Sequence, residues 1–487
     1  MSGQNTAEAA AVPVPHDEVY IGGRWHRPTE GDSIAVLNPA TEEIVGRVPD
    51  SSAVVSAAVE AARDAFEAWS RRSVTERAAY LDALADAIEQ HAEQLAVLAS
   101  TEIGMPLRES RAVQASLPAK ELRSIADIAR SFHWERRDDS GSTVVREPFG
   151  VVLGVTPWNF PVHQIVAKLA PALAAGCTLV LKPAELTPLT AIFLASLCDL
   201  IELPPGVVNV VTGTGVSTGE VLLRGGGYDV VSFTGSLAVG RHIAKVASER
   251  IVRTTLELGG KSPAVVLDDA DLETAVRTTV RNCFTNAGQK CNAPTRLIVP
   301  EGRRADAVDI AVEAAEAYVL GHPLDETTTM GPLASDAQRR KVLSQLSATA
   351  GRVVTGGPAD EFGRGFFVKP AIVTDLPDDD PLVREEIFGP VLCVQGHQGE
   401  RDALRRANDT EYGLSAEIWS SDQARAAAMA RQIRAGQVRV NGVRTPELPA
   451  SPFGGYKASG LGREMGPYAL EEYLEIKAIL GDPEGQA

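Results

Sequence analysis

The chain has 487 residues, of which 44% are hydrophobic, and its 64 acidic residues outnumber its 47 basic ones to give a net charge of −17. This length predicts two or three domains, and the acidity argues against a surface for nucleic acid or anionic membrane. Every apolar run falls short of the ~20 residues that a membrane span needs, so we expect no membrane partner.

The N-terminal third is predicted to combine short strands with helices. Residues 1–15 are small and polar without the pattern of a targeting signal, and we expect a disordered extension there. Residues 19–48 alternate short apolar runs with turns, which is typical of strands. Alanine-rich segments with apolar residues at helical spacing and one polar alternating segment follow. They predict helices over 53–69, 75–100 and 117–132 and an exposed hairpin over 140–147.

From residue 150 onward, short apolar runs alternate with helices, which is typical of a parallel sheet with crossover helices. The expected strands are 151–155, 178–182, 207–212 and 230–234, with helices over 162–175 and 188–200. We therefore interpret 150–257 as a nucleotide-binding type of α/β unit. A second alternation starts near residue 262 and predicts a second α/β domain. Its expected strands are 264–267, 297–299 and 438–440, and its expected helices are 305–319, 336–350 and 423–435.

Two segments at predicted strand ends could bind a dinucleotide. In Phe233-Thr-Gly-Ser-Leu-Ala-Val-Gly240, Gly235 permits close backbone approach and Ser236 can donate to a phosphate at a helix N-terminus. The spacing is not G-x-G-x-x-G, and such glycines are often only turn residues. In Lys182-Pro-Ala-Glu185, a lysine and a carboxylate suit ribose hydroxyls, although a surface ion pair is the alternative.

Two further segments bear on the same ligand. One is Thr156-Pro-Trp-Asn-Phe160, where Asn159 could instead cap the following helix. The other is Glu385-Glu-Ile-Phe-Gly-Pro390, where Glu386 could hold a ribose and Phe388 could pack on a flat ring. A turn that ends a helix is the alternative for this second segment.

One of the five cysteines stands in polar surroundings. Cys291 lies in Gly288-Gln-Lys-Cys-Asn292, whereas the other four lie in apolar or helix-like segments and fit buried structural thiols. Glu257, in Leu256-Glu-Leu-Gly-Gly-Lys-Ser-Pro263, lies 34 residues upstream. A thiolate is a strong nucleophile and a carboxylate can act as its general base. The odd cysteine count argues against a disulfide framework and favours the cytoplasm. No histidine has metal-ligand spacing, so we expect no metal site.

Together these segments resemble the active-site signatures of the aldehyde dehydrogenase superfamily. The resemblance runs from Ile21-Gly-Gly to Ser451-Pro-Phe-Gly-Gly-Tyr-Lys457, with all four cofactor segments in the family's order. The stretches Gln289-Lys-Cys-Asn-Ala-Pro-Thr-Arg296 and His163-Gln-Ile-Val-Ala-Lys168 look most like a bacterial branch related to 6-hydroxyhexanoate dehydrogenase.

The resemblance implies that an aldehyde is oxidised to a carboxylic acid through a thiohemiacetal and a thioester on Cys291. Asn159 and the Cys291 N–H would stabilise the oxyanion, and Glu257 would activate the water that hydrolyses the thioester. Lys168 and Glu464 match positions that the family links to proton relay. The implied cofactor is NAD, with NADP as the alternative. Its implied contacts are Thr156, Pro157, Trp158, Lys182, Glu185, Gly213, Phe233, Gly235, Ser236, Gly240, Leu258, Glu386 and Phe388.

The resemblance also implies an architecture and an assembly. We expect a Rossmann-like NAD-binding domain over 1–130 and 149–257 and an α/β catalytic domain over 258–436. A small β element over 131–148 and 468–487 would bridge to another subunit in a homodimer or homotetramer. Two rival functions are a CoA-acylating aldehyde dehydrogenase, which generally lacks a base like Glu257, and a cysteine esterase. The substrate loops at 162–167, 290–293 and 442–451 are poor in aromatics and favour an aliphatic or extended aldehyde. His163 follows Asn159 closely and could line the substrate entrance, although a surface histidine on a helix is the alternative.

Overall fold

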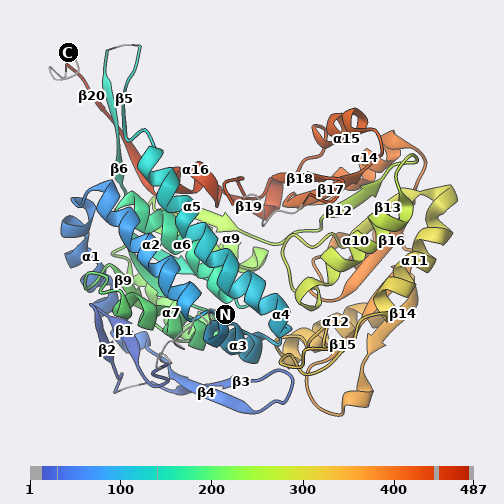
Figure 1. The fold of residues 1–487 in the computed structure, drawn as a ribbon, viewed down its shortest axis with the longest axis horizontal. Helices are drawn as coiled ribbons and strands as arrows, with labels where there is room; N and C mark the ends of the chain where they lie inside the picture. Colours follow the sequence, from blue (N-terminus) through green and yellow to red (C-terminus); the bar gives the residue numbers. More distant parts are fainter. Residues whose placement is uncertain (1–13, 30, 140, 444–448, 482–487) are drawn as a thin grey trace, which may run out of the picture.

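The computed structural model describes residues 14–29, 31–139, 141–443 and 449–481 (Figure 1). The predicted extension at 1–15 therefore lies almost wholly outside the described residues. Within these ranges no helix is both long and apolar enough to cross a membrane.

The first half of the fold is an eight-stranded sheet in the order β19-β11-β10-β7-β8-β9-β1-β2. The five strands from β11 to β9 are parallel, and the strands at both edges are antiparallel. The central strands are buried on both faces, which explains why their sequences are continuous apolar runs. The strands are β1 (Val19–Ile21), β2 (Arg24–His26), β7 (Val151–Val155), β8 (Thr178–Lys182), β9 (Val208–Val210), β10 (Val230–Thr234), β11 (Arg253–Glu257) and β19 (Gly460–Leu461).

Helices cover this sheet and form its main core. They are α1 (Val55–Ser70), α2 (Val74–Gln90), α3 (Ala92–Ile103), α4 (Leu107–Ser110), α5 (Leu117–Ser131), α6 (Pro161–Ala175), α7 (Pro188–Leu200), α8 (Glu220–Gly225), α9 (Leu237–Ser248) and α16 (Gly466–Glu471). The prediction of one helix over 75–100 is wrong, because His91 leaves helical geometry (φ −111°, ψ 21°) between α2 and α3. Ile88 and Leu95 on either side pack into the same core, so the apolar pattern continues across the break.

The second half is a seven-stranded sheet in the order β14-β15-β16-β13-β12-β17-β18. Its strands are β12 (Pro263–Val266), β13 (Arg296–Pro300), β14 (Arg352–Pro358), β15 (Val368–Thr374), β16 (Val391–His397), β17 (Ser415–Trp419) and β18 (Gln437–Val440). Its helices are α10 (Leu272–Phe284), α11 (Arg304–Glu316), α12 (Asp336–Ala348), α13 (Pro381–Arg384), α14 (Glu400–Asn408) and α15 (Gln423–Ala430). The helices predicted to reach residues 319, 350 and 435 end earlier, at 316, 348 and 430.

Two small sheets complete the fold. β3 (Ser33–Leu37) pairs with β4 (Ile44–Pro49), and β20 (Leu474–Ile479) pairs with the hairpin of β5 (Glu135–Arg137) and β6 (Thr143–Pro148). The three-stranded sheet projects from the body of the molecule (Figure 1). The expectation that the C-terminal tail forms strands from Tyr468 onward is wrong for its first residues, which belong to α16. The division into domains by residue range stays a prediction.

Candidate active site

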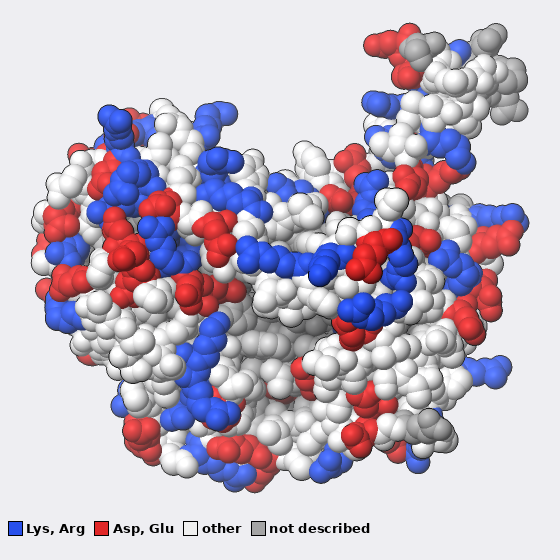
Figure 2. Space-filling model, turned by 180° about the vertical axis from the view of Figure 1, so that it is seen from behind, with Lys and Arg blue, Asp and Glu red and all other residues white. Residues whose placement is uncertain are grey.

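The predicted site residues gather where the parallel strands of the first sheet end. β7, β8, β10 and β11 finish side by side, and Thr234 at the end of β10 is paired with Glu257 at the end of β11. In open α/β sheets, ligands bind at this carboxyl edge. The back of the molecule is hollowed between its two halves (Figure 2).

The loop that carries Cys291 has an unusual backbone. After α10, residues Asn286, Ala287 and Gly288 all have positive φ values, of 50°, 52° and 74°. Non-glycine residues rarely adopt this left-handed conformation, and it often accompanies functional sites. A Cβ on Gly288 would lie 2.2 Å from the carbonyl oxygen of Gly389, so only glycine lets these two loops meet. The other four cysteines are buried, whereas Cys291 is half-buried.

The Cys291 loop meets the Glu257 turn. A Cβ on Gly260 would lie 2.6 Å from the Cys291 carbonyl oxygen, which shows how closely the two segments pack. Burial, together with the nearby carboxylates of Glu386 and Glu257, raises the pKa of the Cys291 thiol to about 12, although the Lys290 charge acts in the opposite direction. At neutral pH the resting thiol is therefore protonated, and its reaction needs a base or a cation beside it.

Glu257 has the properties that a general base needs. Its side chain is buried, and neither carboxylate oxygen has a hydrogen-bond partner among the described residues. Burial raises its pKa well above the usual value, and the neighbouring Glu464 carboxylate adds to that rise. A carboxylate with free oxygens and a raised pKa can take a proton from a thiol or a water.

Asn159 forms hydrogen bonds with the Cys291 loop and does not cap helix α6. Its Nδ2 donates to the Gln289 carbonyl at 2.9 Å, and its backbone carbonyl accepts from Asn286 Nδ2 at 2.8 Å. Helix α6 begins after Phe160, and no side chain caps it. The capping alternative for Asn159 is therefore wrong. One of its two amide hydrogens remains for another acceptor.

Helix α6 contributes one side chain to each of two further polar pairs. Lys168 on α6 is fully buried, and its Nζ donates to Glu464 at 2.5 Å and to Thr234 at 2.6 Å. His163 forms an ion pair with Glu121 of α5 at 2.9 Å. The first pair connects to Glu257, because the Glu464 and Lys168 charges both act on the Glu257 pKa.

Lys182 and Glu185 form an ion pair that lies only partly at the surface. Their charged groups are 3.4 Å apart, but the Lys182 side chain is only 3% exposed while that of Glu185 is 43% exposed. Burial lowers the Lys182 pKa. Lys182 is the last residue of β8, and Glu185 is the partner of its ammonium at 3.4 Å. The ammonium therefore keeps hydrogen-bond donors that a ligand can use.

The loops that follow β9 and β10 contain glycines at positions that leave no room for a side chain. At Gly213, where φ is 147°, a Cβ would collide with the Thr218 hydroxyl. At Gly235 a Cβ would lie 2.4 Å from the Phe233 ring. Ser236 is the N-cap of α9, and its hydroxyl accepts from Val239 N at 3.4 Å. These bare backbone segments at a helix N-terminus suit a phosphate.

Glu386 and Phe388 follow α13 and belong to the second half of the fold. Glu386 accepts from Gly260 N at 3.1 Å, and burial raises its pKa to about 7. Phe388, with φ 60°, packs edge-on against Trp158 at 5.4 Å between ring centroids. Four other contacts were predicted nearby. Thr156 and Pro157 follow β7, the Thr156 hydroxyl is buried without a partner among the described residues, and Leu258 packs on Gly240.

The comparisons with known proteins agree with this geometry. The sequence profile of the aldehyde dehydrogenase family matches residues 25–479. The chain belongs to the aldehyde dehydrogenase family. It is 43% identical over 477 residues to a 3-succinoylsemialdehyde-pyridine dehydrogenase of Pseudomonas sp, covering 95% of this chain and 98% of that protein. It is 40% identical to the geranial dehydrogenase of Castellaniella defragrans, covering 96% and 99%.

Solved structures of this family share the fold. Aldehyde dehydrogenase C of Pseudomonas syringae, a cysteine-to-alanine variant in complex with NAD+ and octanal, has a TM-score of 0.94 and 42% identity over 96% of this chain and 97% of that one. Betaine aldehyde dehydrogenase of Staphylococcus aureus in complex with NAD+ has a TM-score of 0.92 and 35% identity over 95% and 94%. The predicted α/β fold class is confirmed, whereas the predicted bacterial branch stays a prediction.

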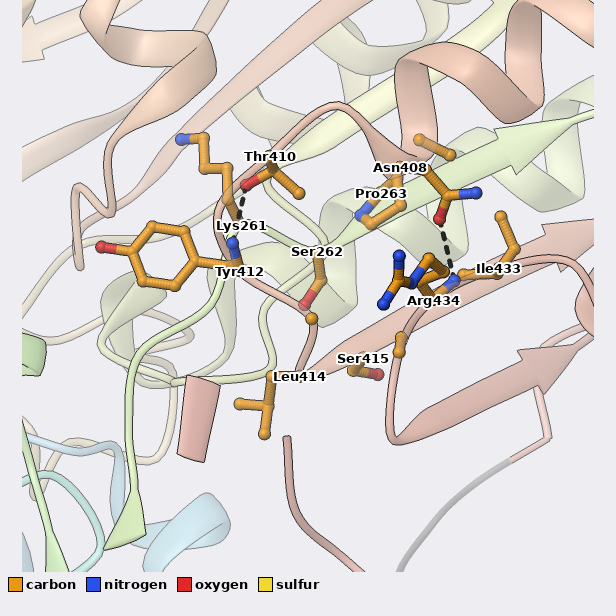
Figure 3. A pocket seen from close by; sticks show the side chains of 13 residues that line it. Lys261, Ser262, Pro263, Asn408, Thr410, Tyr412, Leu414, Ser415, Ile433 and Arg434 are labelled. Atoms are coloured by element: carbon orange, nitrogen blue, oxygen red, sulfur yellow. Dashed lines mark hydrogen bonds between the residues drawn. The ribbon is translucent and has the colours of Figure 1, made fainter. Parts of the chain in front are cut away.

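A small cavity in this aldehyde dehydrogenase lies beside the glycine-containing turn that follows Glu257. Figure 3 shows Lys261, Ser262 and Tyr412 on its wall, with the Asn408 side chain accepting from Arg434 N at 2.8 Å. Its volume is about 10 Å³, which holds no more than about one water. It is therefore not a substrate pocket. In the described ranges no group of three or more His, Cys, Asp or Glu side chains could hold a metal ion.

Sequence reasoning missed the ionic residues around the Cys291 loop. Arg439 on β18 donates to the Asn292 carbonyl at 3.4 Å and pairs with Glu417 on β17 at 3.2 Å. Neither residue stands in a motif, and only strand pairing brings them to the loop. Lys290 precedes Cys291 directly, so its position alone could have singled it out.

Proposed function

We propose that this aldehyde dehydrogenase uses NAD to oxidise an aliphatic or extended aldehyde to its carboxylic acid through a thiohemiacetal and a thioester on Cys291. One observation carries the proposal. Glu257 keeps both carboxylate oxygens free of hydrogen bonds at the point where its turn meets the Cys291 loop. A buried carboxylate is costly unless it is used or paired.

The carbonyl addition step follows from this arrangement. The Cys291 thiolate adds to the aldehyde carbon, and the former carbonyl oxygen becomes an oxyanion. The second amide hydrogen of Asn159 and the backbone N–H of Cys291 are the donors we assign to that oxygen. The Cys291 N–H has no acceptor in the described part of the chain. Donors that are fixed before the reaction stabilise the developing charge without reorganisation.

Glu257 acts on both sides of the oxidation. It receives the thiol proton before addition, and it later takes a proton from the water that attacks the thioester. Lys168 and Glu464 stand next to it and can pass that proton away from the site. The final products are a carboxylic acid, the reduced cofactor and the free cysteine.

The residues at the strand ends fit NAD. When bound, NAD supplies the two-electron oxidant that turns the thiohemiacetal into a thioester. Lys182 and Glu185 would hold the adenosine ribose, because Lys182 keeps donors and Glu185 offers an acceptor. Ser236 at the start of α9 would meet the pyrophosphate. Glu386 and Phe388 would position the nicotinamide side.

The test of this function is an assay with a panel of aldehydes that differ in chain length, with and without NAD, followed by the absorbance of the reduced cofactor. We expect turnover that requires NAD and proceeds without coenzyme A. Turnover that requires coenzyme A would favour the acylating rival. Ester hydrolysis with no aldehyde oxidation would favour the cysteine esterase.

NAD should be preferred over NADP. Glu185 would face the adenosine 2′-position, where the NADP phosphate would meet a carboxylate at a cost of order 1 kcal/mol near a screened surface. We expect a severalfold higher kcat/KM with NAD, because Lys182 offsets part of the repulsion. Glu185→Gln should raise the efficiency with NADP relative to NAD. Equal efficiency with both cofactors in the unaltered enzyme would contradict this assignment.

The projecting sheet supports a homodimer or homotetramer. Ile476 on its outer strand β20 is 68% exposed, and Leu480 just after that strand is 79% exposed. Exposed apolar side chains beside an open strand edge favour pairing with another copy. Light scattering should give two or four times the mass of one chain, and Ile476→Lys should shift the particles toward monomers. Glu475→Lys, on the opposite face of the strand, is the control. A monomeric unaltered protein would refute the assignment.

We also propose the cytoplasm as the compartment. All five cysteines are free thiols, and four of them are buried in the cores. Free thiols persist in a reducing environment.

The substrate loop predicted at 442–451 falls partly on residues 444–448, which lie outside the described residues.

A further inference from the structure

A buried ion pair lies beside the Cys291 loop. Glu417 on β17 and Arg439 on β18 stand directly opposite each other in the pairing of these two parallel strands. Their charged groups are 3.2 Å apart, and their side chains are 1% and 11% exposed. The cost of taking two charges out of water offsets much of their attraction, so such a pair adds little to the stability of a fold. The other contacts of the two side chains are therefore the better guide to their role.

The pair contacts the chain on both sides of Cys291. Before the loop, Asn282 of α10 donates from Nδ2 to Glu417 Oε1 at 2.9 Å. After the nucleophile, Arg439 Nη2 donates to the Asn292 carbonyl at 3.4 Å. The same two atoms, Glu417 Oε1 and Arg439 Nη2, form the ion pair. One ion pair of the second sheet therefore holds the chain nine residues before Cys291 and one residue after it.

Arg439 acts on the turn that carries the nucleophile. Ala293 N donates to the Lys290 carbonyl at 3.2 Å and closes a turn around Cys291. The Lys290 carbonyl and the Cys291 N–H belong to one planar peptide group, so fixing the first also fixes the direction of the second. The Asn292 carbonyl, which Arg439 holds, lies in the same turn. The contact with Arg439 therefore restrains the N–H that we assign to the oxyanion.

The first half of the fold holds the same loop through Asn159, whose Nδ2 donates to the Gln289 carbonyl at 2.9 Å. Two non-glycine residues of this loop have positive φ values, and such a strained backbone persists only where the surrounding contacts impose it. The Asn159 amide and the Cys291 N–H are the two donors assigned to the oxyanion, and both must be in place before the charge develops. Glu417 and Arg439 supply the restraint from the second half.

We infer that the Glu417–Arg439 ion pair positions the Cys291 loop so that the Cys291 N–H is aimed at the oxyanion. The inference rests on the proposed function, in which Cys291 is the nucleophile. Glu417 and Arg439 are positioning residues in this account, because they act through the loop and do not touch the reacting atoms. A misplacement of about 1 Å can slow a reaction about 100-fold. The pair should therefore affect kcat and leave the binding of NAD unchanged.

The test replaces both charges at once. In Glu417→Met/Arg439→Met, unbranched apolar side chains take the place of the pair and leave no unpaired charge in the sheet, so the melting temperature should stay near that of the unaltered protein. We expect kcat to fall ~10- to 100-fold, whereas the Kd for NAD, measured by calorimetric titration, should not change. Glu417→Gln keeps an acceptor for Asn282 and should lose less activity than the double variant.

A second measurement reads the oxyanion contact without NAD. Acylation of Cys291 by p-nitrophenyl acetate passes through a tetrahedral oxyanion and releases nitrophenolate in a burst. The double variant should slow this burst by about the same factor as kcat. Alkylation of Cys291 by iodoacetamide forms no oxyanion, and its rate should stay near that of the unaltered protein. Arg304→Met/Asp375→Asn is the matched control, because these residues form an ion pair at 2.6 Å in the same half of the fold.

The outcomes separate the inference from the proposed function. Unaltered kcat and an unaltered burst in the double variant would overturn the inference, because the pair would then serve the fold alone. If the double variant does not fold, Asn282→Ala gives the same comparison, since it releases α10 and leaves the ion pair intact. Acylation of an unaltered protein that never reduces NAD would overturn the proposed function, and the burst would still test the inference. An unaltered protein that is not acylated at Cys291 would overturn both.

Discussion

Replacing Cys291 with alanine is expected to abolish both aldehyde oxidation and ester hydrolysis. Alanine offers no nucleophile, so neither the thiohemiacetal nor the thioester can form, and the loss should reach ~10,000-fold or more. NAD should still bind, because Lys182, Ser236 and Glu386 make no contact through the sulfur. Steady-state reduction of NAD and calorimetric titration of NAD measure the two effects separately.

Cys283→Ala is the matched control for this result. Cys283 is buried on α10, and its Sγ donates weakly to the Val391 carbonyl at 3.7 Å. Burial raises the pKa of its thiol far above the usual range. We expect unchanged kcat and a stability loss of ~1 kcal/mol, which is typical of removing one buried heavy atom. Appreciable turnover in Cys291→Ala would refute the role of Cys291 as the nucleophile, but it would not contradict the fold.

The strands of the first sheet were predictable because helices cover both of its faces. The runs at 151–155, 178–182 and 230–234 coincide with β7, β8 and β10, since a strand buried on both sides is apolar at every position. β11 was missed as a strand, because its sequence Arg-Thr-Thr-Leu-Glu mixes exposed and buried residues at the sheet's outer side. Whether such a segment forms a strand depends on the tertiary packing that buries it, and the local sequence pattern does not show this.

Some features of the candidate site could also be predicted from the local sequence, whereas others could not. Cys291 and Glu257 stand in distinctive segments and were predicted from them, and the structure brings those segments into contact. The bond between Asn159 and Gln289 spans 130 residues, and the pair of Glu417 and Arg439 depends on the register of two strands. No local sequence pattern predicts such partners, because the tertiary fold brings together segments that are far apart in the chain.

Glu257→Gln is expected to slow hydrolysis of the thioester more than its formation. Glutamine keeps the shape of the side chain but cannot take a proton from water. General-base catalysis contributes ~100- to 10,000-fold, which is the loss we expect in steady-state turnover. Rapid mixing should show a fast burst of reduced NAD followed by a slow phase, and mass spectrometry of the quenched protein should find an acyl adduct on Cys291. If Glu257 also deprotonates the thiol, the burst slows as well.

The pH dependence of the unaltered enzyme gives an independent measure of the same group. Because the Glu257 pKa is raised, the base is ionised only above that pKa, and the rate of hydrolysis should fall as the pH drops through it. Ionising a buried carboxylate also costs stability, so stability should fall as pH rises from the ordinary glutamate pKa toward the raised one. Glu257→Gln removes both dependences and should melt no lower than the unaltered protein above that window. Wild-type turnover in the variant would mean that another residue is the base and that Glu257 is only a carboxylate in a turn.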